Sequence, residues 1–137
     1  FGQATLWRWK QGGLNFAHLG GSAAPLTGEG KVLLGRPDIL IIGVGGGAKV
    51  YNGDEAAKVV KELNPRRVIP VQYLSTNSSV ECDLSNVEPF LQAMKSAKVI
   101  EVGKIFRVPR NLGENTIINL MNPNQKSEVS TDFNSQT

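Results

Sequence analysis

The sequence has few of the residues on which many chemistries depend: one histidine, one cysteine and 7% aromatic residues in a chain of 137. The single cysteine, Cys82, cannot form an internal disulfide, which excludes a small disulfide-stapled secreted fold. The longest apolar run, ILIIGVGGGA, is far shorter than the roughly 20 residues that span a bilayer, and no signal peptide is visible. We therefore expect an intracellular protein of a reducing compartment, cytoplasm or plastid, with no membrane span.

An excess of charge of either sign is also missing. Fifteen Lys and Arg against 12 Asp and Glu give a net charge of +3, which favours solubility but does not indicate a nucleic-acid surface. The segment KIFRVPR is predicted to place Lys104, Arg107 and Arg110 along a strand and its exit. Such a basic edge either docks an acidic partner or prevents pairing with other strands. We do not expect nucleic acid as a partner.

The first half of the chain alternates strands and helical segments. ATLWRWK and LNFAHL, separated by QGG, predict a hairpin over residues 4–19 whose first strand is half-buried. TGEGKVLLG predicts one short helical turn, and PDILIIGV a strand covered on both faces. NGDEAAKVVKELNP predicts a helix that begins with a capping box of Asn52 and Glu55 and ends at Pro65.

The second half predicts two more strands around a helix. RRVIPVQY reads as a strand in which Pro70 implies an edge or a bulge, and SNVEPFLQAMKSA as a helix with Ser85 and Glu88 as its capping box. KVIEVG and KIFRVP predict a hairpin. We therefore expect an α/β fold with helices on one outer face of a mixed sheet in residues 1–110, followed by an Asn/Ser-rich tail over 111–137 that is extended or disordered apart from TIINLM.

The glycine-rich loop after PDILIIGV raises the question of a nucleotide site. Gly43, Gly45 and Ala48 approach the G-x-G-x-x-G/A pattern, but in a dinucleotide site the helix begins inside the glycine run. Here KVYNG intervenes and the helix is capped near Asn52. The alternative is a tight passage without Cβ atoms beneath a neighbouring segment, and we favour it.

Two longer stretches carry a family resemblance. HLGGSAAPLT and LGRPDILIIGVGGGAKVYNGDEAAKVVKELNPRRVIPVQYLST resemble the C-terminal half of the metallo-β-lactamase superfamily, in the branch of Zn-dependent hydrolases, over roughly residues 4–110. The resemblance implies half of a four-layer αββα sandwich, with a metal site between its two sheets at one edge. The family's T-H-x-H-x-D-H loop belongs to the other, N-terminal half, and since the chain begins at Phe1 directly before a strand, we expect that half to be missing.

The resemblance also implies where metal ligands would stand. The Asp of the family's HLGD falls on Gly21, the His of its PMHY on Gln72, and a second His on Ala24. His18 remains, although in the family it precedes the ligand. A catalytic zinc takes three protein ligands and a water, and a bridging carboxylate makes two cations roughly 3.5–4 Å apart tolerable. This chain alone therefore implies no cofactor; zinc remains possible if the missing half supplies ligands.

We assign no catalytic residue and no metal ligand with certainty; His18 and Gln72 are the candidates. His18 is either a residual ligand or base, or a side chain that bonds a loop carbonyl. Gln72 either contacts a substrate or satisfies backbone groups at a strand end. Cys82, before a helix, is either a reactive or an inert thiol, and we favour the inert one. GGSAA does not match the G-x-S-x-G serine elbow, so Ser22 is set aside.

Two functions follow from these residues. The first is a degenerate metallo-β-lactamase-fold protein, a pseudoenzyme that serves as scaffold or binding subunit of a larger assembly. Its open sheet would be covered by its own N-terminal half or by another protein chain, because a bare apolar sheet face is unstable in water. The alternative is a metal-dependent, metallo-β-lactamase-like hydrolase whose ligands come mainly from the missing half. The sequence leaves enzymatic activity open.

Overall fold

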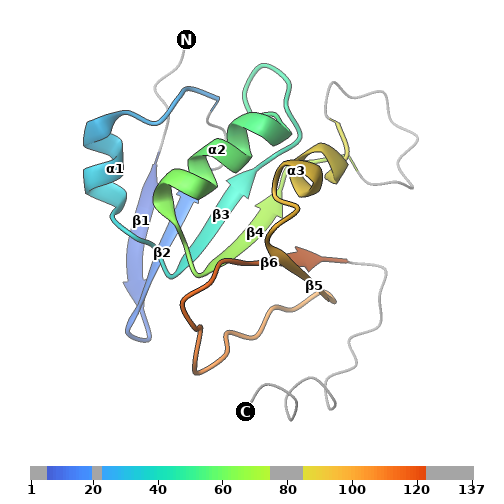
Figure 1. Cartoon of the computed structure of the whole chain (residues 1–137). Helices are drawn as coiled ribbons and strands as arrows, with labels where there is room; N and C mark the ends of the chain where they lie inside the picture. The colour runs from blue at the N-terminus through green and yellow to red at the C-terminus, as the bar shows by residue number, and fades with distance from the viewer. Residues whose placement is uncertain (1–5, 20–22, 75–84, 123–137) are drawn as a thin grey trace.

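A computed structural model describes residues 6–19, 23–74 and 85–122. They form one six-stranded sheet in the order β1-β2-β3-β4-β6-β5, with three helices (Figure 1). The elements in chain order are β1 Trp7–Gln11, β2 Leu14–Leu19, α1 Gly28–Leu34, β3 Ile39–Gly43, α2 Gly53–Leu63, β4 Arg67–Val71, α3 Glu88–Ala93, β5 Lys98–Val102 and β6 Ile117–Met121. Only the β1–β2 pair is antiparallel among these strands.

The predicted hairpin at the start of the chain is confirmed. β1 pairs with β2 around Gly12 and Gly13, whose φ values of 58° and 79° suit the left-handed turn that glycine allows. The prediction that its first strand is half-buried is wrong, because all five residues of β1 are exposed. β1 lies at the edge of the sheet, so it has one strand neighbour only.

The helices α1 and α2 connect the parallel strands β2, β3 and β4. α1 is longer than the single turn expected and is capped by the Thr27 hydroxyl, which accepts a hydrogen bond from Gly30 N at 3.0 Å. The capping box of α2 is confirmed: Asn52 Oδ1 accepts from Glu55 N at 2.8 Å, and Glu55 Oε1 from Asn52 N at 3.0 Å. α2 ends at Asn64 in the left-handed conformation.

Pro70 lies in an interior strand, which corrects the prediction of an edge strand. β4 runs between β3 and β6, and Pro70 pairs with Ile42 on the β3 side. On the other side the β6 ladder covers only Arg67 and Val68. The missing N–H of Pro70 therefore leaves no gap in a ladder, which is the condition under which a strand tolerates proline.

The capping box predicted for α3 is wrong. α3 begins at Glu88, later than a Ser85 cap requires, and its N-cap residue Val87 makes no side-chain capping bond. Instead, the Asn86 Oδ1 accepts a hydrogen bond from Glu88 N at 3.0 Å, and proline follows in the first turn, where its missing N–H has no cost. The predicted apolar face is confirmed, since Phe90 and Met94 are buried in the core.

The hairpin predicted after α3 is also wrong. β5 does pair with another strand, but that strand is β6, in parallel register from Lys98↔Ile117 to Val102↔Met121. The segment KIFRVPR that carries Lys104, Arg107 and Arg110 has no strand. β6 brings Ile118 to 0% exposure between β4 and β5, so burial of TIINLM outweighs the local pairing of two neighbouring segments. Residues 123–137 of the predicted tail lie outside the part of the chain that the structure describes.

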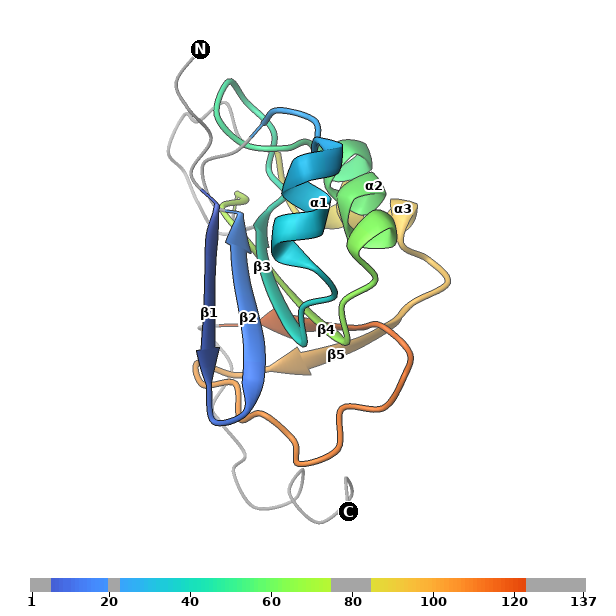
Figure 2. The same ribbon diagram turned by 90° about the vertical axis from the view of Figure 1, so that its left-hand side faces the viewer.

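All three helices cover one face of the sheet, as the sequence predicts (Figure 2). The main core lies between them and the strand residues that point to that face: Ala17, Leu19, Leu40, Ile42, Val68 and Ile118, all at 0% exposure. The opposite face has no helix among the described residues. Central side chains that point there, such as Ile41 and Ile69, are only half-buried. The helices thus pack on one side of the sheet, whereas on the other side Ile39, Arg67 and Asn119 are buried without a helix over them among the described residues.

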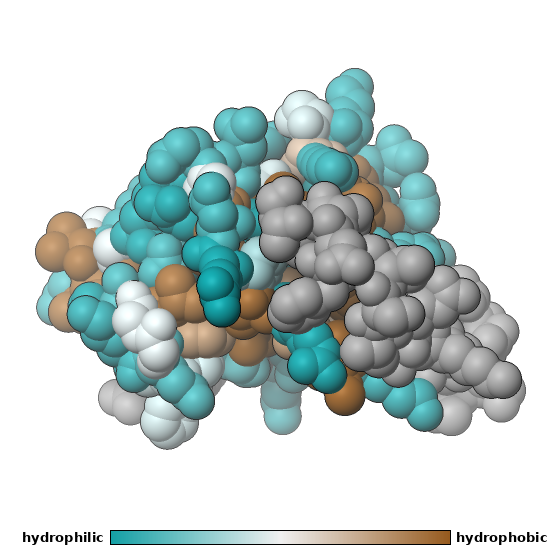
Figure 3. Space-filling view, turned by 90° about the horizontal axis from the view of Figure 1, so that it is seen from below, coloured by the Kyte–Doolittle hydropathy of each residue, from teal (hydrophilic) through white to brown (hydrophobic). Residues whose placement is uncertain are grey.

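Apolar side chains also reach the surface outside the core. Seen from below, they gather at the left and along the middle of the molecule (Figure 3). The large hydrophobic side chains with the greatest exposure are Val32, Ile105, Trp7 and Leu33. None of the helices in the described part of the chain is long and apolar enough to cross a membrane.

We expect Asn52→Ala to lower the free energy of unfolding by about 1 kcal/mol, because the first turn of α2 loses the capping hydrogen bond from Glu55 N to the Asn52 side chain. Urea denaturation of the natural full-length protein, followed by circular dichroism, measures the change. Lys58→Ala, at an exposed site of the same helix, is the control and should change stability by less than about 0.5 kcal/mol. Equal effects of the two substitutions would contradict a stabilising role of the box.

Candidate functional site

The candidate site lies where the parallel strands β2, β3 and β4 end. Because their carboxyl ends meet at one edge of the sheet, the segments that follow them come together there (Figure 1), and ligands of open α/β sheets bind at such edges. These segments are residues 23–27 after β2, the glycine-rich loop 44–52 after β3, and residues 72–74 after β4.

Gln72 directly follows β4 in an unusual conformation. Its φ is +52°, and among the described non-glycine residues only Asn64 shares a positive φ. Its side chain lies over the end of β3: a Cβ atom on Gly43 would stand 2.7 Å from Gln72 Oε1 and 2.5 Å from Val50 Cγ1. Residues with a strained backbone conformation of this kind are found preferentially at functional sites. No local sequence pattern predicts this left-handed φ of Gln72.

Gly45 explains why the loop after β3 is rich in glycine. A Cβ atom there would overlap the carbonyl oxygen of Gln72, a backbone atom. Hydrogen bonds hold the segments together: Val44 N donates to Val71 O at 3.1 Å, Ser85 N to Gly45 O at 2.6 Å, and Leu74 N to Ser85 O at 2.9 Å. The loop is therefore a passage without Cβ atoms against a neighbouring segment, as the sequence analysis favoured.

The start of α2 does not resemble a dinucleotide site. The helix begins at Gly53, after the glycine run rather than inside it. The carboxylate of Glu55 lies over its first turn and accepts the backbone hydrogen bond of Asn52. A negative side chain at this position interacts favourably with the helix dipole and competes with a phosphate for the same amides.

His18 lies on the face of the sheet that the helices leave open. It is the next-to-last residue of β2, in the row of Ile41 and Ile69, and it is half-buried. Gln72 extends over Gly43, one strand from His18 and two residues farther along the strand direction, which is about 7 Å. The two candidates thus lie at the same end of the sheet but in different rows.

Two tyrosines fix the loops around this edge. The hydroxyl of Tyr51, a buried residue, donates to Ala24 O at 2.6 Å, which ties the glycine-rich loop to the segment after β2. The hydroxyl of Tyr73 donates to Met121 O at 3.4 Å. Burial raises the pKa of Tyr73 above its usual value, so this hydroxyl stays a neutral donor at physiological pH. Both tyrosines have packing and positioning roles here.

The donor atoms of the described residues do not fit a zinc site by themselves. Gly21, Ser22 and Cys82 lie outside the described residues. Among residues 6–19, 23–74 and 85–122, no group of three or more His, Cys, Asp or Glu side chains is placed to hold a metal ion. A catalytic zinc takes three protein ligands, and the neutral amide of Gln72 is a much weaker donor than an imidazole.

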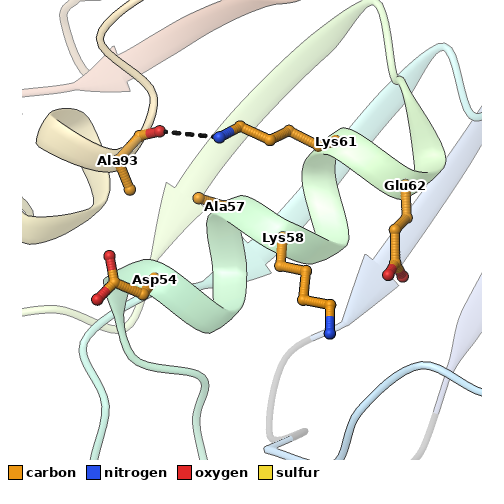
Figure 4. A pocket seen from close by; sticks show the side chains of 6 residues that line it. All are labelled: Asp54, Ala57, Lys58, Lys61, Glu62 and Ala93. Carbon is orange, nitrogen blue, oxygen red and sulfur yellow. Dashed lines mark hydrogen bonds between the residues drawn. The ribbon is translucent and has the colours of Figure 1, made fainter.

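A separate groove of about 550 Å³ lies on the helix layer. Its lining is Asp54, Ala57, Lys58, Lys61 and Glu62 of α2 with Ala93 of α3 (Figure 4). Two of its charges are already engaged: Lys61 Nζ donates to Ala93 O at 3.2 Å, and Glu62 pairs with Lys31 at 3.2 Å. It is a surface groove formed by α2 and α3.

Comparison with known families identifies the fold. The sequence model of the β-lactamase superfamily domain matches residues 1–72, just over half of the chain. The chain belongs to the metallo-β-lactamase superfamily. Among curated proteins, none matches the sequence. The strand ends described above therefore belong to a metallo-β-lactamase domain.

A solved structure supports the same fold. It is that of a proposed Zn-dependent hydrolase of the metallo-β-lactamase superfamily from Thermotoga maritima, with a TM-score of 0.72 and 24% identity. The match covers 85% of this chain and 59% of the other. The chain thus spans about three fifths of that metallo-β-lactamase protein. One mixed sheet with helices on one face is the half-sandwich that the sequence predicts.

We expect Gly45→Ala to lower the free energy of unfolding by about 1–3 kcal/mol, the usual cost of overpacking. The added methyl group meets the Gln72 carbonyl, which cannot move without disturbing the bonds around Ser85. Gly28→Ala is the control, because a Cβ atom there meets nothing within 4 Å, and an α1 site gains up to about 1 kcal/mol from alanine. Denaturant titration of the natural full-length protein compares them; similar effects would refute the close passage.

Proposed function

We propose that this metallo-β-lactamase-fold protein is non-catalytic and serves as a scaffold or binding subunit. The observation that carries the proposal is Gln72, which stands where the family resemblance implies a histidine ligand. Its side chain packs over Gly43 and Val50. An amide oxygen in this place holds hydrogen bonds, whereas the family's chemistry requires a ring nitrogen on the metal.

The other family position supports the same proposal. The resemblance places the bridging aspartate at Gly21, and a glycine has no side chain to coordinate a metal. Loss of a bridging carboxylate removes the negative charge that holds two cations close together. With Gln72 and Gly21 at the two positions, this part of the domain retains His18 as its one imidazole.

The binding role is supported by the one-sided packing of the sheet. Apolar side chains of all six strands face the side without helices, including Phe16, Ile41 and Ile69. A face of this kind is covered in a stable assembly. We propose that the cover is an upstream part of the same protein or another protein chain, since the chain spans 59% of the related structure.

The metal-dependent hydrolase is the second candidate. It is favoured by the same coverage of 59%, because residues outside this chain would then supply the ligands. In that case Gln72 or a water would complete the coordination of a metal held elsewhere.

We expect the natural full-length protein, purified without chelators or a histidine tag, to contain metal only at background level by plasma mass spectrometry, even after incubation with excess zinc. Gln72→His should leave the content unchanged, because Gly21 still offers no carboxylate. Near-stoichiometric zinc or iron in the parent would instead favour the hydrolase. Gln72→Ala would then be expected to reduce its activity, and the scaffold proposal would be withdrawn.

A further inference from the structure

The positive charge of the chain is concentrated in one stretch of sequence. Residues 95–110 carry five Lys or Arg against one Glu, a net charge of +4, while the whole chain carries +3. The remainder is therefore close to neutral, so electrostatic attraction of an acidic partner acts mainly through this stretch. Its cations are all exposed: Lys95, Lys98, Lys104, Arg107 and Arg110.

The cations of this stretch are not used in ion pairs among the described residues. The ion pairs of that part of the chain involve Lys31, Arg36 and Arg66, and none involves a cation of residues 95–110. Exposed charges need no counter-charge for stability, so the lack of pairs is not a source of strain. It leaves these side chains available to carboxylates of another molecule.

Apolar side chains are exposed between the cations. Val99, Ile105 and Val108 are 40%, 63% and 38% exposed, so three of the seven exposed large hydrophobic side chains of the described residues lie in this one stretch. Exposed apolar side chains that gather in one place mark interaction surfaces. A simple anion would neutralise the cations but leave Ile105 and Val108 in water. A partner for this stretch therefore brings apolar groups as well as negative charge.

Residues 103–110 also have unused backbone hydrogen-bonding groups. They lead from the end of β5, the edge strand of the sheet, along the lower rim of the molecule (Figure 1, Figure 2). The stretch is held at both ends: Val102 O accepts from Asn122 N at 2.8 Å, and Leu112 O accepts from Arg67 Nη1 at 2.7 Å. Between these ends, no backbone group of residues 104–110 bonds to the backbone of another described residue. Exposed N–H and C=O groups of this kind can bond an extended peptide.

The same features favour a polypeptide over the other polyanions and over a second copy. Single-stranded nucleic acid is bound by aromatic side chains that stack on its bases, and the one aromatic residue of residues 95–110, Phe106, is half-buried. A phosphate backbone also offers no apolar group to cover Ile105. A second copy of the same stretch would bring like charges together, which is unfavourable. Acidic and apolar side chains occur together in a polypeptide.

We propose that residues 103–110 bind an extended acidic segment of another protein. Its Asp or Glu side chains pair with Lys104 and Arg107, its apolar side chains cover Ile105 and Val108, and its backbone bonds the exposed backbone groups between them. The proposal adds a surface and a partner class to the binding role proposed above. It uses neither the strand ends nor the sheet face without helices, so it does not depend on the loss of metal ligands.

The test measures binding of a fluorescein-labelled decapeptide of alternating Glu and Val to the natural full-length protein, by fluorescence anisotropy at low salt. We expect the double substitution Lys104→Ala and Arg107→Ala to raise the Kd at least about fivefold, because two charge pairs are lost. Ile105→Ser should also raise the Kd, by about threefold or more, because apolar contact is lost. The matched control, Lys10→Ala with Lys58→Ala, removes the same charge at two exposed sites elsewhere and should change the Kd less than about twofold.

An equal loss of binding in the control variant would overturn the inference, because the net charge and not this stretch would then attract the peptide. An unchanged Kd for Ile105→Ser, or tighter binding of a thymidine oligonucleotide of ten residues, would overturn it in favour of a general polyanion site. No binding by the parent would overturn it as well. If Glu128→Gln with Asp132→Asn then produced binding, acidic residues of the chain itself would be the occupant. A zinc-loaded protein that binds the peptide as expected would refute the non-catalytic proposal alone.

Discussion

The packing of all three helices on one face of the sheet is the constraint on which the rest of this structure depends. Strand residues that face α1, α2 and α3 are fully buried, with Leu40, Ile42 and Val68 at 0% exposure, so hydrophobic burial there stabilises the chain. Their neighbours one position along each strand point the other way and are half-buried at Ile41 and Ile69. Because strand side chains alternate, the same backbone that builds the core also places apolar side chains on the opposite face.

The strand ends follow from a different constraint, close contact between backbones. Gly45 passes against the Gln72 carbonyl, and Gly53 lies against the backbone of Pro89 and Phe90, where a Cβ atom would stand 2.5 Å from Phe90 N. These contacts fix the positions of the loops whether or not a metal is bound. The loop geometry therefore does not depend on the ligand chemistry of the family. The glycines are required for the loop geometry.

Sequence patterns predicted the elements whose signals are local. The capping box of α2, the hairpin around Gly12 and the helix face of Phe90 and Met94 each depend on a few neighbouring residues. The predictions that were wrong concern features that depend on residues far apart in the sequence. β6 displaced the expected β5 hairpin because it fills the space between β4 and β5. Tertiary packing determines the left-handed φ of Gln72, the burial of Arg67 and the lack of a hydrogen-bond partner at Asn119 Oδ1 among the described residues. No short sequence pattern predicts these features.

The stabilising contacts of this metallo-β-lactamase domain are separate from the ligand chemistry that the family resemblance implies. None of the stabilising contacts described above uses an imidazole or a carboxylate at a family ligand position. The core is apolar, the close loop contacts are made at glycine positions, and the ion pairs of Arg66 with Asp38 and Glu114 lie at the opposite ends of the strands. We therefore expect substitution of Gln72 to leave the burial of the helix-facing core unchanged. The open face, in contrast, retains half-buried apolar side chains such as Ile41 and Ile69, so the proposed binding role would impose a constraint on this sheet that metal binding need not share.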